Sequence, residues 1–255
     1  GITENQIRIS ENGESCKILS LGQVTEKLPI NLVIIVDHSG SMLSDNYSKL
    51  DEQKMILYRD KMKTFSPLFN AKKAINTFVQ EFNNDNDLAM IIGFSSNVDL
   101  ITNFTNSKSE LLTQLNQLDE VGGTAFFDAI NTGIDSLINK KGINIIVALT
   151  DGDDNASSVS AQEIIKKSKE FEVPIYIIGL GEIRKNILES IATATKGSFY
   201  YSKTSTSLIS VYNDVAKRIK SIYEVKYVSN TLDYENENRE ILMEFEIDTL
   251  LINSI

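Results

Sequence analysis

Cysteine, histidine and tryptophan are almost missing from this sequence, whose 255 residues include one Cys, one His and no Trp. The lone Cys16 excludes an intrachain disulfide and a thiolate zinc cluster. Any Ser-His-Asp or Cys-His catalysis, and any histidine metal site, would have to use the lone His38. Most hydrolase mechanisms are therefore disfavoured, and we expect a non-enzymatic protein.

Positive charge and long apolar runs are also scarce. The chain has 25 Lys and Arg against 35 Asp and Glu, a formal net charge of −10, and we find no local basic patch. An acidic surface repels phosphate backbones and anionic membrane faces, so we expect no nucleic-acid partner. No apolar run is long enough to span a bilayer, so we expect no direct membrane insertion. A start at Gly1 and an end at Ile255 fit an excised fragment, so a missing signal peptide says little about the native chain.

What the sequence does contain is a series of near-continuous apolar runs separated by amphipathic segments. Runs without polar alternation are typical of parallel strands that helices cover on both faces. The runs span residues 32–36, 88–94, 143–149 and 173–180. Their alternation with helical stripes predicts an α/β fold with a doubly wound, mostly parallel sheet. Residues 98–101 follow Phe94 too closely for a crossover helix, so we expect them to form an antiparallel edge strand.

The two ends of the chain show the period-two alternation of half-exposed strands. Ile7 and Ile9 precede an Asn-Gly turn, which predicts an N-terminal β-hairpin. Residues 223–227 and 243–247 alternate in the same way. We therefore predict three parts: an N-terminal hairpin over 1–29, the α/β domain over 30–222, and C-terminal strands over 223–255. Both ends should meet in a small flanking antiparallel sheet; the alternative is that they are frayed extensions.

Oxygen-bearing side chains gather where the predicted strands end. Asp37, Ser39 and Ser41 follow the first strand, and Asp151 follows the strand over 143–149. Thr124 follows two glycines at the start of a predicted helix. Ligands of open α/β sheets bind at the carboxyl ends of strands, so we expect these five side chains to face one point. Two carboxylates and three hydroxyls, with no thiolate or imidazole, favour Mg²⁺, with Ca²⁺ or Mn²⁺ as alternatives.

This pattern resembles the metal-ion-dependent adhesion site of von Willebrand factor A domains, over about residues 30–222, in a form found in exported bacterial proteins. The resemblance implies a Rossmann-like sheet of six strands with one antiparallel edge strand. It implies that Ser39 and Ser41 bind the metal directly and Thr124 directly or through water. Asp37 and Asp151 would act directly or through bridging water. Because few charged ligands touch the ion, a partner's Asp or Glu carboxylate can complete its coordination.

Residues 43–69 depart from that family, in which the metal loop passes almost directly into its helix. We predict an amphipathic helical insertion on the metal-bearing face, kinked or ended at Ser66 by Pro67, with a second helix from about Asn70. Its apolar stripe comprises Met55, Tyr58, Met62, Phe65 and Phe69. The insertion either packs on the domain as a satellite helix or walls the metal site and narrows the choice of partner.

Four polar residues beside this pattern have ordinary structural interpretations. We expect His38 to lie at the rim or in packing, and Asp128 to cap or orient the helix after Thr124. Asp153 and Asp154 are expected in a solvated acidic loop, with hydrogen bonding around the metal ligands as the alternative.

The resemblance implies a non-enzymatic, metal-dependent adhesion or scaffolding module. Its expected place is outside the cytoplasm of a bacterium, in the periplasm or at the cell surface. The first alternative is a cytoplasmic adaptor subunit of an AAA+ ATPase. A metal-dependent phosphoryl-transfer enzyme is a remote alternative, because no Gly-rich phosphate loop follows a strand and no basic residue lies beside Asp37.

Overall fold

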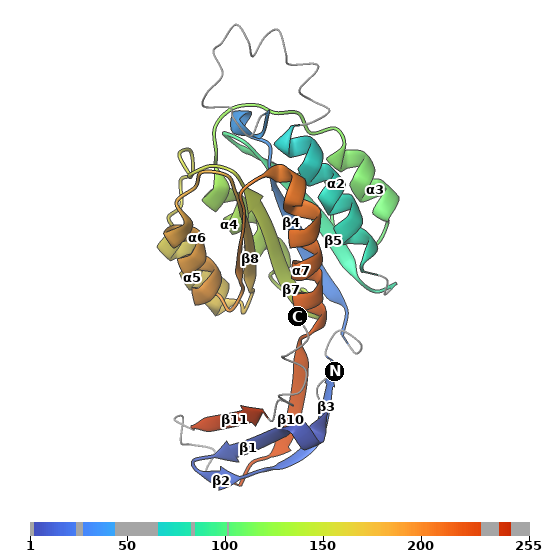
Figure 1. Cartoon of the computed structure of the whole chain (residues 1–255), viewed down its shortest axis with the longest axis vertical. Helices are drawn as coiled ribbons and strands as arrows, with labels where there is room; N and C mark the ends of the chain where they lie inside the picture. The colour runs from blue at the N-terminus through green and yellow to red at the C-terminus, as the bar shows by residue number, and fades with distance from the viewer. Residues whose placement is uncertain are drawn as a thin grey trace, which may run out of the picture. The chain divides into compact units, whose positions relative to one another are not determined.

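The structure, a computed structural model shown in Figure 1, describes residues 3–23, 28–43, 66–82, 85–100, 102–230 and 240–245. The chain divides into two compact units. One comprises residues 28–219, and the other combines the two ends, residues 1–27 and 220–255.

The larger unit is built on a six-stranded sheet in the order β6-β5-β4-β7-β8-β9. All neighbours in it pair in parallel except β5 and β6, which are antiparallel, as the short connection after Phe94 predicted. Every residue of β4 is buried, which explains its unbroken apolar run. The strands are β4 (Ile30–Asp37), β5 (Leu88–Phe94), β6 (Val98–Leu100), β7 (Ile143–Thr150), β8 (Ile175–Leu180) and β9 (Phe199–Ser202).

Helices cover both faces of this sheet, so the doubly wound α/β prediction is confirmed. In Figure 1, α2 (Pro67–Gln80), α3 (Lys108–Leu115) and α7 (Leu208–Lys220) lie on one side of the sheet. On the other side lie α4 (Phe126–Leu137), α5 (Ala161–Glu170) and α6 (Lys185–Ala194). Short 3-10 turns η3 (Gly40–Leu43) and η5 (Ser205–Ser207) precede α2 and α7 along the chain.

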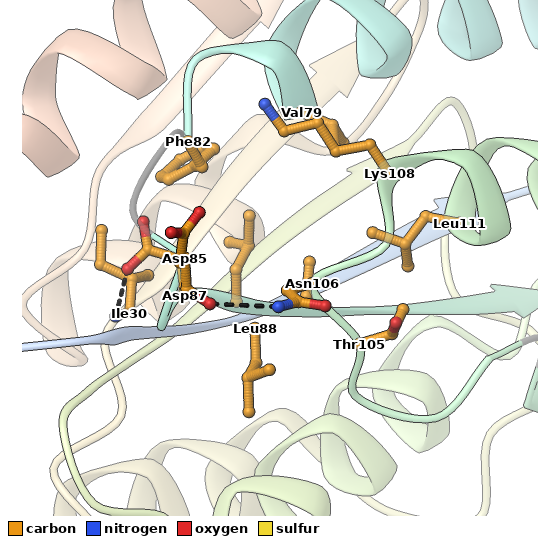
Figure 2. Close-up of a pocket in the computed structure, with 12 residues that line it drawn as sticks. Ile30, Val79, Phe82, Asp85, Asp87, Leu88, Thr105, Asn106, Lys108 and Leu111 are labelled. Atoms are coloured by element: carbon orange, nitrogen blue, oxygen red, sulfur yellow. Dashed lines mark hydrogen bonds between the residues drawn. The ribbon is translucent and has the colours of Figure 1, made fainter.

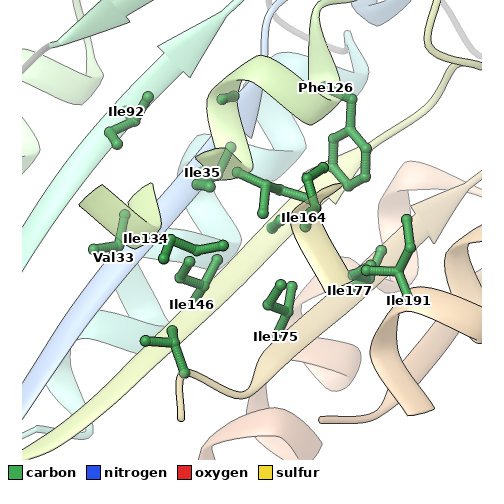
Figure 3. Close-up of a cluster of buried hydrophobic side chains, with 14 of the residues drawn as sticks. Val33, Ile35, Ile92, Phe126, Ile134, Ile146, Ile164, Ile175, Ile177 and Ile191 are labelled. Carbon is green, nitrogen blue, oxygen red and sulfur yellow. The ribbon is translucent and has the colours of Figure 1, made fainter. Parts of the chain in front are cut away.

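Buried aliphatic side chains join the sheet to the helices on each face. Figure 3 shows the α4 to α6 side, where Val33 and Ile146 of the sheet lie near Ile134 of α4. On the α2 and α7 side, the Tyr212 and Phe78 rings pack with centroids 5.1 Å apart. Within the part of the chain that the structure describes, no helix has the length and apolar character needed to cross a bilayer.

The start of α2 corrects one prediction. The second helix begins at Pro67 and not at about Asn70, because proline suits the first helical position, where a missing N–H costs nothing. The Ser66 hydroxyl caps this end by accepting the N–H of Phe69 at 3.0 Å. Residues 67–69 therefore form the first turn of α2. Residues 44–65 of the predicted insertion lie outside the described residues, so a helix there and its end at Ser66 stay predictions.

The smaller unit contains two antiparallel sheets, one of three strands and one of two. The predicted hairpin is present: β1 (Ile7–Glu11) and β2 (Glu14–Ser15) flank Asn12 and Gly13, whose positive φ values of 52° and 85° suit a tight two-residue turn. β11 (Ile241–Phe245) pairs with the other edge of β1, so the two chain ends meet as predicted. The second sheet pairs β3 (Lys17–Gln23) with β10 (Tyr223–Val228).

Candidate metal centre

The candidate site lies where the strand order of the large sheet reverses. β4 pairs with β5 on one side and with β7, which comes later in the chain, on the other. Because Val36 lies opposite Leu149, the carboxyl ends of β4 and β7 stop at the same level. This topological switch point is where open α/β sheets bind ligands, and it brings Asp37 and Asp151 to one edge.

The loop after β4 bends back on its own carboxylate. The Ser39 N–H donates to Asp37 Oδ1 at 2.8 Å, and the hydroxyl oxygens of Ser39 and Ser41 lie 3.0 Å apart. The Gly40 N–H donates to the carbonyl of Gly122 at 3.0 Å, which ties this loop to the turn that carries Thr124. Two hydroxyls therefore stand beside a carboxylate within five residues of chain.

The loop after β7 joins the same hydrogen-bonded set. The Ser41 hydroxyl donates to Asp151 Oδ1 at 2.6 Å, and the Thr150 hydroxyl donates to Asp37 Oδ2 at 2.7 Å. The Asp151 N–H also donates to the Asp37 carboxylate. The structure thus brings four predicted site residues into direct contact: Asp37, Ser39, Ser41 and Asp151.

Thr124, the fifth predicted residue, faces the set across Gly152. A Cβ at Gly152 would lie 3.2 Å from Thr124 Oγ1 and 3.9 Å from Ser41 Oγ. These two hydroxyls therefore face a common small space, which stays open because residue 152 has no side chain. The turn is held from the β5–β6 side as well, since the Gly123 N–H donates to Ser96 Oγ at 2.6 Å.

The charge balance of the site suits a cation. Asp37 is fully buried, and within the described residues no lysine or arginine forms an ion pair with it. Burial raises the pKa of the Asp37 carboxyl, and hydrogen bonds from Ser39, Thr150 and Asp151 only partly offset this effect. A buried carboxylate without a countercharge is costly, and a divalent ion among hard oxygen donors supplies one. The residues present therefore fit Mg²⁺.

The candidate set carries little charge for a metal site. Within the described ranges, no three Asp, Glu, His or Cys side chains gather as a metal-binding group. The set instead combines two carboxylates with three neutral hydroxyls, so its negative charge would do no more than balance a divalent ion.

Three residues that the sequence did not single out support this arrangement. Thr150 is fully buried and links the two carboxylate loops. Ser96 and Asn155 accept the backbone N–H groups of Gly123 and Thr124. The Thr-Asp-Gly motif at a strand end was a signal for Thr150, whereas nothing local marks Ser96 or Asn155.

The neighbouring polar residues are all engaged. His38 is buried in packing, with Nδ1 2.9 Å from the carbonyl of Asp119 and Nε2 3.4 Å from Asp99 Oδ2. Asp153 is not simply solvated, because Oδ2 accepts from Arg184 Nε at 2.7 Å.

Asp154 and Asp128 lie at the start of α4. Asp154 Oδ2 accepts the N–H of Phe127 at 2.9 Å, which corrects the expectation of a solvated loop. Asp128 is structural, as predicted, but it holds the loop before α5 by accepting the N–H groups of Ser158 and Val159.

A separate cavity of about 250 Å³ lies at the opposite ends of β4 and β5 (Figure 2). Its lining includes Ile30, Leu88 and Leu111, together with Asp87, whose Oδ1 accepts the N–H of Ile30 at 2.9 Å. This carboxylate fastens the start of β4 to the start of β5. The cavity shares no residue with the candidate metal centre.

Sequence comparison places most of the chain in one family. The profile of the von Willebrand factor type A domain matches residues 31–214. YfbK of Escherichia coli (strain K12) is 25% identical over 247 residues, which cover 89% of this chain and 40% of that protein. Protein sll0103 of Synechocystis is 21% identical over 202 residues, covering 77% of this chain and 43% of that protein. The chain thus spans less than half the length of these relatives.

Solved structures show the same fold at low identity. A von Willebrand factor type A protein from Catenulispora acidiphila has a TM-score of 0.61 at 16% identity, over 86% of this chain and 52% of that one. Proximal thread matrix protein 1 from the mussel byssus, in a structure with a zinc-occupied MIDAS motif, has a TM-score of 0.60 at 18% identity, over 78% and 47%.

BatB from Bacteroides thetaiotaomicron has a TM-score of 0.57 at 18% identity, over 75% of this chain and all of that one. Domains of this type are commonly metal-dependent protein-interaction modules. The family match, the strand order and the position of the loops at the switch point agree, and this chain belongs to the von Willebrand factor type A domain family.

Proposed function

We propose that the domain is a non-enzymatic module that binds a partner protein through a shared divalent cation, Mg²⁺. The observation that carries the proposal is the hydrogen-bonded set of Asp37, Ser39, Ser41 and Asp151 at the switch point, with Thr124 facing the same space. The zinc in the MIDAS motif of the mussel byssus protein supports metal binding at such a site in this fold.

The roles of the residues follow from their chemistry. The hydroxyls of Ser39, Ser41 and Thr124 are neutral donors that suit direct contact with Mg²⁺. Asp37 and Asp151 supply the negative charge. Asp151 orients the Ser41 hydroxyl by accepting its hydrogen bond, and the Thr150 hydroxyl orients Asp37 by donating to it. When bound, the ion supplies a Lewis-acidic position that a carboxylate can occupy.

An acidic side chain of the partner is the ligand that this site favours. The chain carries a net charge of −10, so a partner's Asp or Glu approaching the surface without a cation meets repulsion. A cation at the site turns this repulsion into attraction at that site alone, so binding becomes specific for the site and dependent on the metal. The proposed place is extracytoplasmic in a bacterium; the pilus tip protein Mfa5 of Porphyromonas gingivalis and the minor pilin PilB of Streptococcus sanguinis share this fold and support it.

The test is capture of partner proteins on the immobilised chain in Mg²⁺ and in EDTA. Thr124→Ala removes a hydroxyl from the site, and Thr132→Ala is the matched control, because that hydroxyl bonds only the α4 carbonyl of Asp128 at 2.9 Å. We expect partners to be retained by the wild type and Thr132→Ala in Mg²⁺, and lost in EDTA or with Thr124→Ala.

Amidation of the carboxyl groups of a captured protein should also abolish its binding in Mg²⁺. Retention of the same proteins in EDTA, or by Thr124→Ala as well as by the control, would contradict the proposal.

A further inference from the structure

Helix α4, which directly follows Thr124, has no cap of its own. Its N-cap position is Ala125, which has no side chain that accepts a hydrogen bond. The first N–H groups of a helix have no partner within the helix and need acceptors from elsewhere. The acceptors for this helix must therefore come from another part of the chain.

They come from the loop between β7 and α5, which also carries Asp151. Asn155 Oδ1 accepts the N–H of Thr124 at 3.0 Å. Asp154 Oδ2 and Ser157 Oγ accept two N–H groups of the first turn, those of Phe127 at 2.9 Å and Asp128 at 3.0 Å, while the Ala125 N–H donates to the carbonyl of Ser95 at 2.7 Å. Each cap reaches about thirty residues back along the chain, to the start of α4.

The bonds also run in the opposite direction. The N–H groups of Asn155 and Ala156 donate to the carbonyl of Thr124 at 3.0 and 3.2 Å. The carboxylate of Asp128 accepts the N–H of Ser158 at 3.0 Å and that of Val159 at 3.1 Å. We call this reciprocal set, between residues 124–128 and 154–159, the α4 clasp.

From the clasp we infer that Asn155 is a positioning residue for metal binding, which holds the Thr124 hydroxyl at a fixed place relative to Asp151. Asn155 bonds both the N–H and the carbonyl of Thr124, so the Thr124 backbone is fixed to the Asp151 loop and not to its own helix. The loops that carry Thr124 and Asp151 are then held together, so their oxygen donors are already in place before a cation binds. The inference rests on the proposed function and adds a residue outside the metal ligands.

The test is calorimetric titration of the full chain with Mg²⁺, together with the unfolding midpoint of each variant in EDTA. Asn155→Ala keeps the backbone bond but removes the side-chain acceptor, and we expect Mg²⁺ affinity to fall about tenfold, as for other residues that orient metal ligands. Asn155→Asp keeps an acceptor oxygen and should recover most of the affinity.

Asp153→Ala is the matched control. Asp153 lies in the same loop but bonds Arg184, outside the clasp, so its loss should leave Mg²⁺ affinity within about twofold of the wild type. Unchanged affinity in Asn155→Ala, or an equal loss in Asp153→Ala, would overturn the inference. If Asn155→Ala is unfolded in EDTA, Asn155→Ser serves the same comparison, because its shorter side chain cannot reach the Thr124 N–H. Failure of the wild type itself to bind Mg²⁺ would instead refute the proposed function.

Discussion

Replacing Asp37 with Asn separates the proposed metal-binding role of this carboxylate from its structural one. Asn has nearly the same shape as Asp. Its amide N–H can donate to the Thr150 hydroxyl, because that hydroxyl lies 3.1 Å from the carbonyl of Gly152 and can donate its own hydrogen there instead. The Ser39 N–H keeps an acceptor in the amide oxygen. In EDTA we therefore expect the free energy of unfolding to stay within about 1 kcal/mol of the wild type.

Magnesium should then distinguish the two proteins. A ligand that binds only the folded state at one hundred times its Kd stabilises that state by about 2.7 kcal/mol. For a unit of the size of 28–219, each kcal/mol corresponds to about 2–4 °C in Tm, so the wild type should gain about 5–10 °C. Asp37→Asn should gain almost nothing, because the charge that attracts the ion is gone.

The pH dependence of this effect has a definite sign. Burial raises the pKa of Asp37, so the folded state holds that proton more tightly than the unfolded state does. Without metal, the ionised group costs stability at neutral pH, and this cost is relieved as the pH falls through the folded pKa. Because proton and cation compete for the same carboxylate, the gain from Mg²⁺ should shrink as the pH falls.

Thermal unfolding in EDTA and in Mg²⁺, at several pH values, measures all of these quantities. Asp153→Asn is the control, since it makes the same change of charge on a carboxylate that bonds Arg184. A rise in Tm with Mg²⁺ that is equal in the wild type and in Asp37→Asn would refute the reasoning.

Three further substitutions test other parts of the account. Tyr212→Phe removes a buried hydroxyl that has no hydrogen-bond partner among the residues that the structure describes, so urea unfolding should show about 1 kcal/mol more stability, and a loss would contradict this. Gly152→Ala places a methyl group 3.2 Å from Thr124 Oγ1, so Mg²⁺ affinity measured by calorimetry should fall severalfold while circular dichroism stays unchanged. Ser160→Ala removes the N-cap of α5 and should cost about 1 kcal/mol in urea unfolding. Hydrogen bonds from Ser160 lower the pKa of Glu163, so the stability that ionised Glu163 contributes is lost as the pH falls. Ser160→Ala should therefore lose less stability on acidification than the wild type, and an equal loss would contradict this prediction.

Most of the large sheet could be predicted because its signals are local. The strands β4, β5, β7 and β8 coincide with near-continuous apolar runs, and the short gap after Phe94 already required the antiparallel edge strand β6. The sixth strand, β9, is short and only partly buried, and no apolar run marked it. Prolines are harder to interpret, since Pro67 can end one helix or begin the next. The Ser66 cap shows that a helix begins at Pro67, and its partner is a backbone N–H that the apolar pattern does not reveal.

For the candidate site, the sequence could predict only which polar side chains come together. Asp37 and Asp151 lie at strand ends, where topology alone brings them near each other. The residues that hold the site, Ser96 and Asn155, bond turns that lie about thirty residues away in the chain. No periodicity or spacing encodes such a contact, because it depends on how two separate loops pack.

A crystal structure of the chain grown with Mn²⁺, which takes the same oxygen ligands as Mg²⁺ and scatters anomalously, tests the central claim most directly. The account predicts one anomalous peak between Ser39, Ser41 and Thr124, about 2.1 Å from the two serine hydroxyls, with water or a foreign carboxylate at an open position. The account is contradicted if no peak appears there, or if the peak lies elsewhere while these hydroxyls stay bonded only to one another and to Asp151.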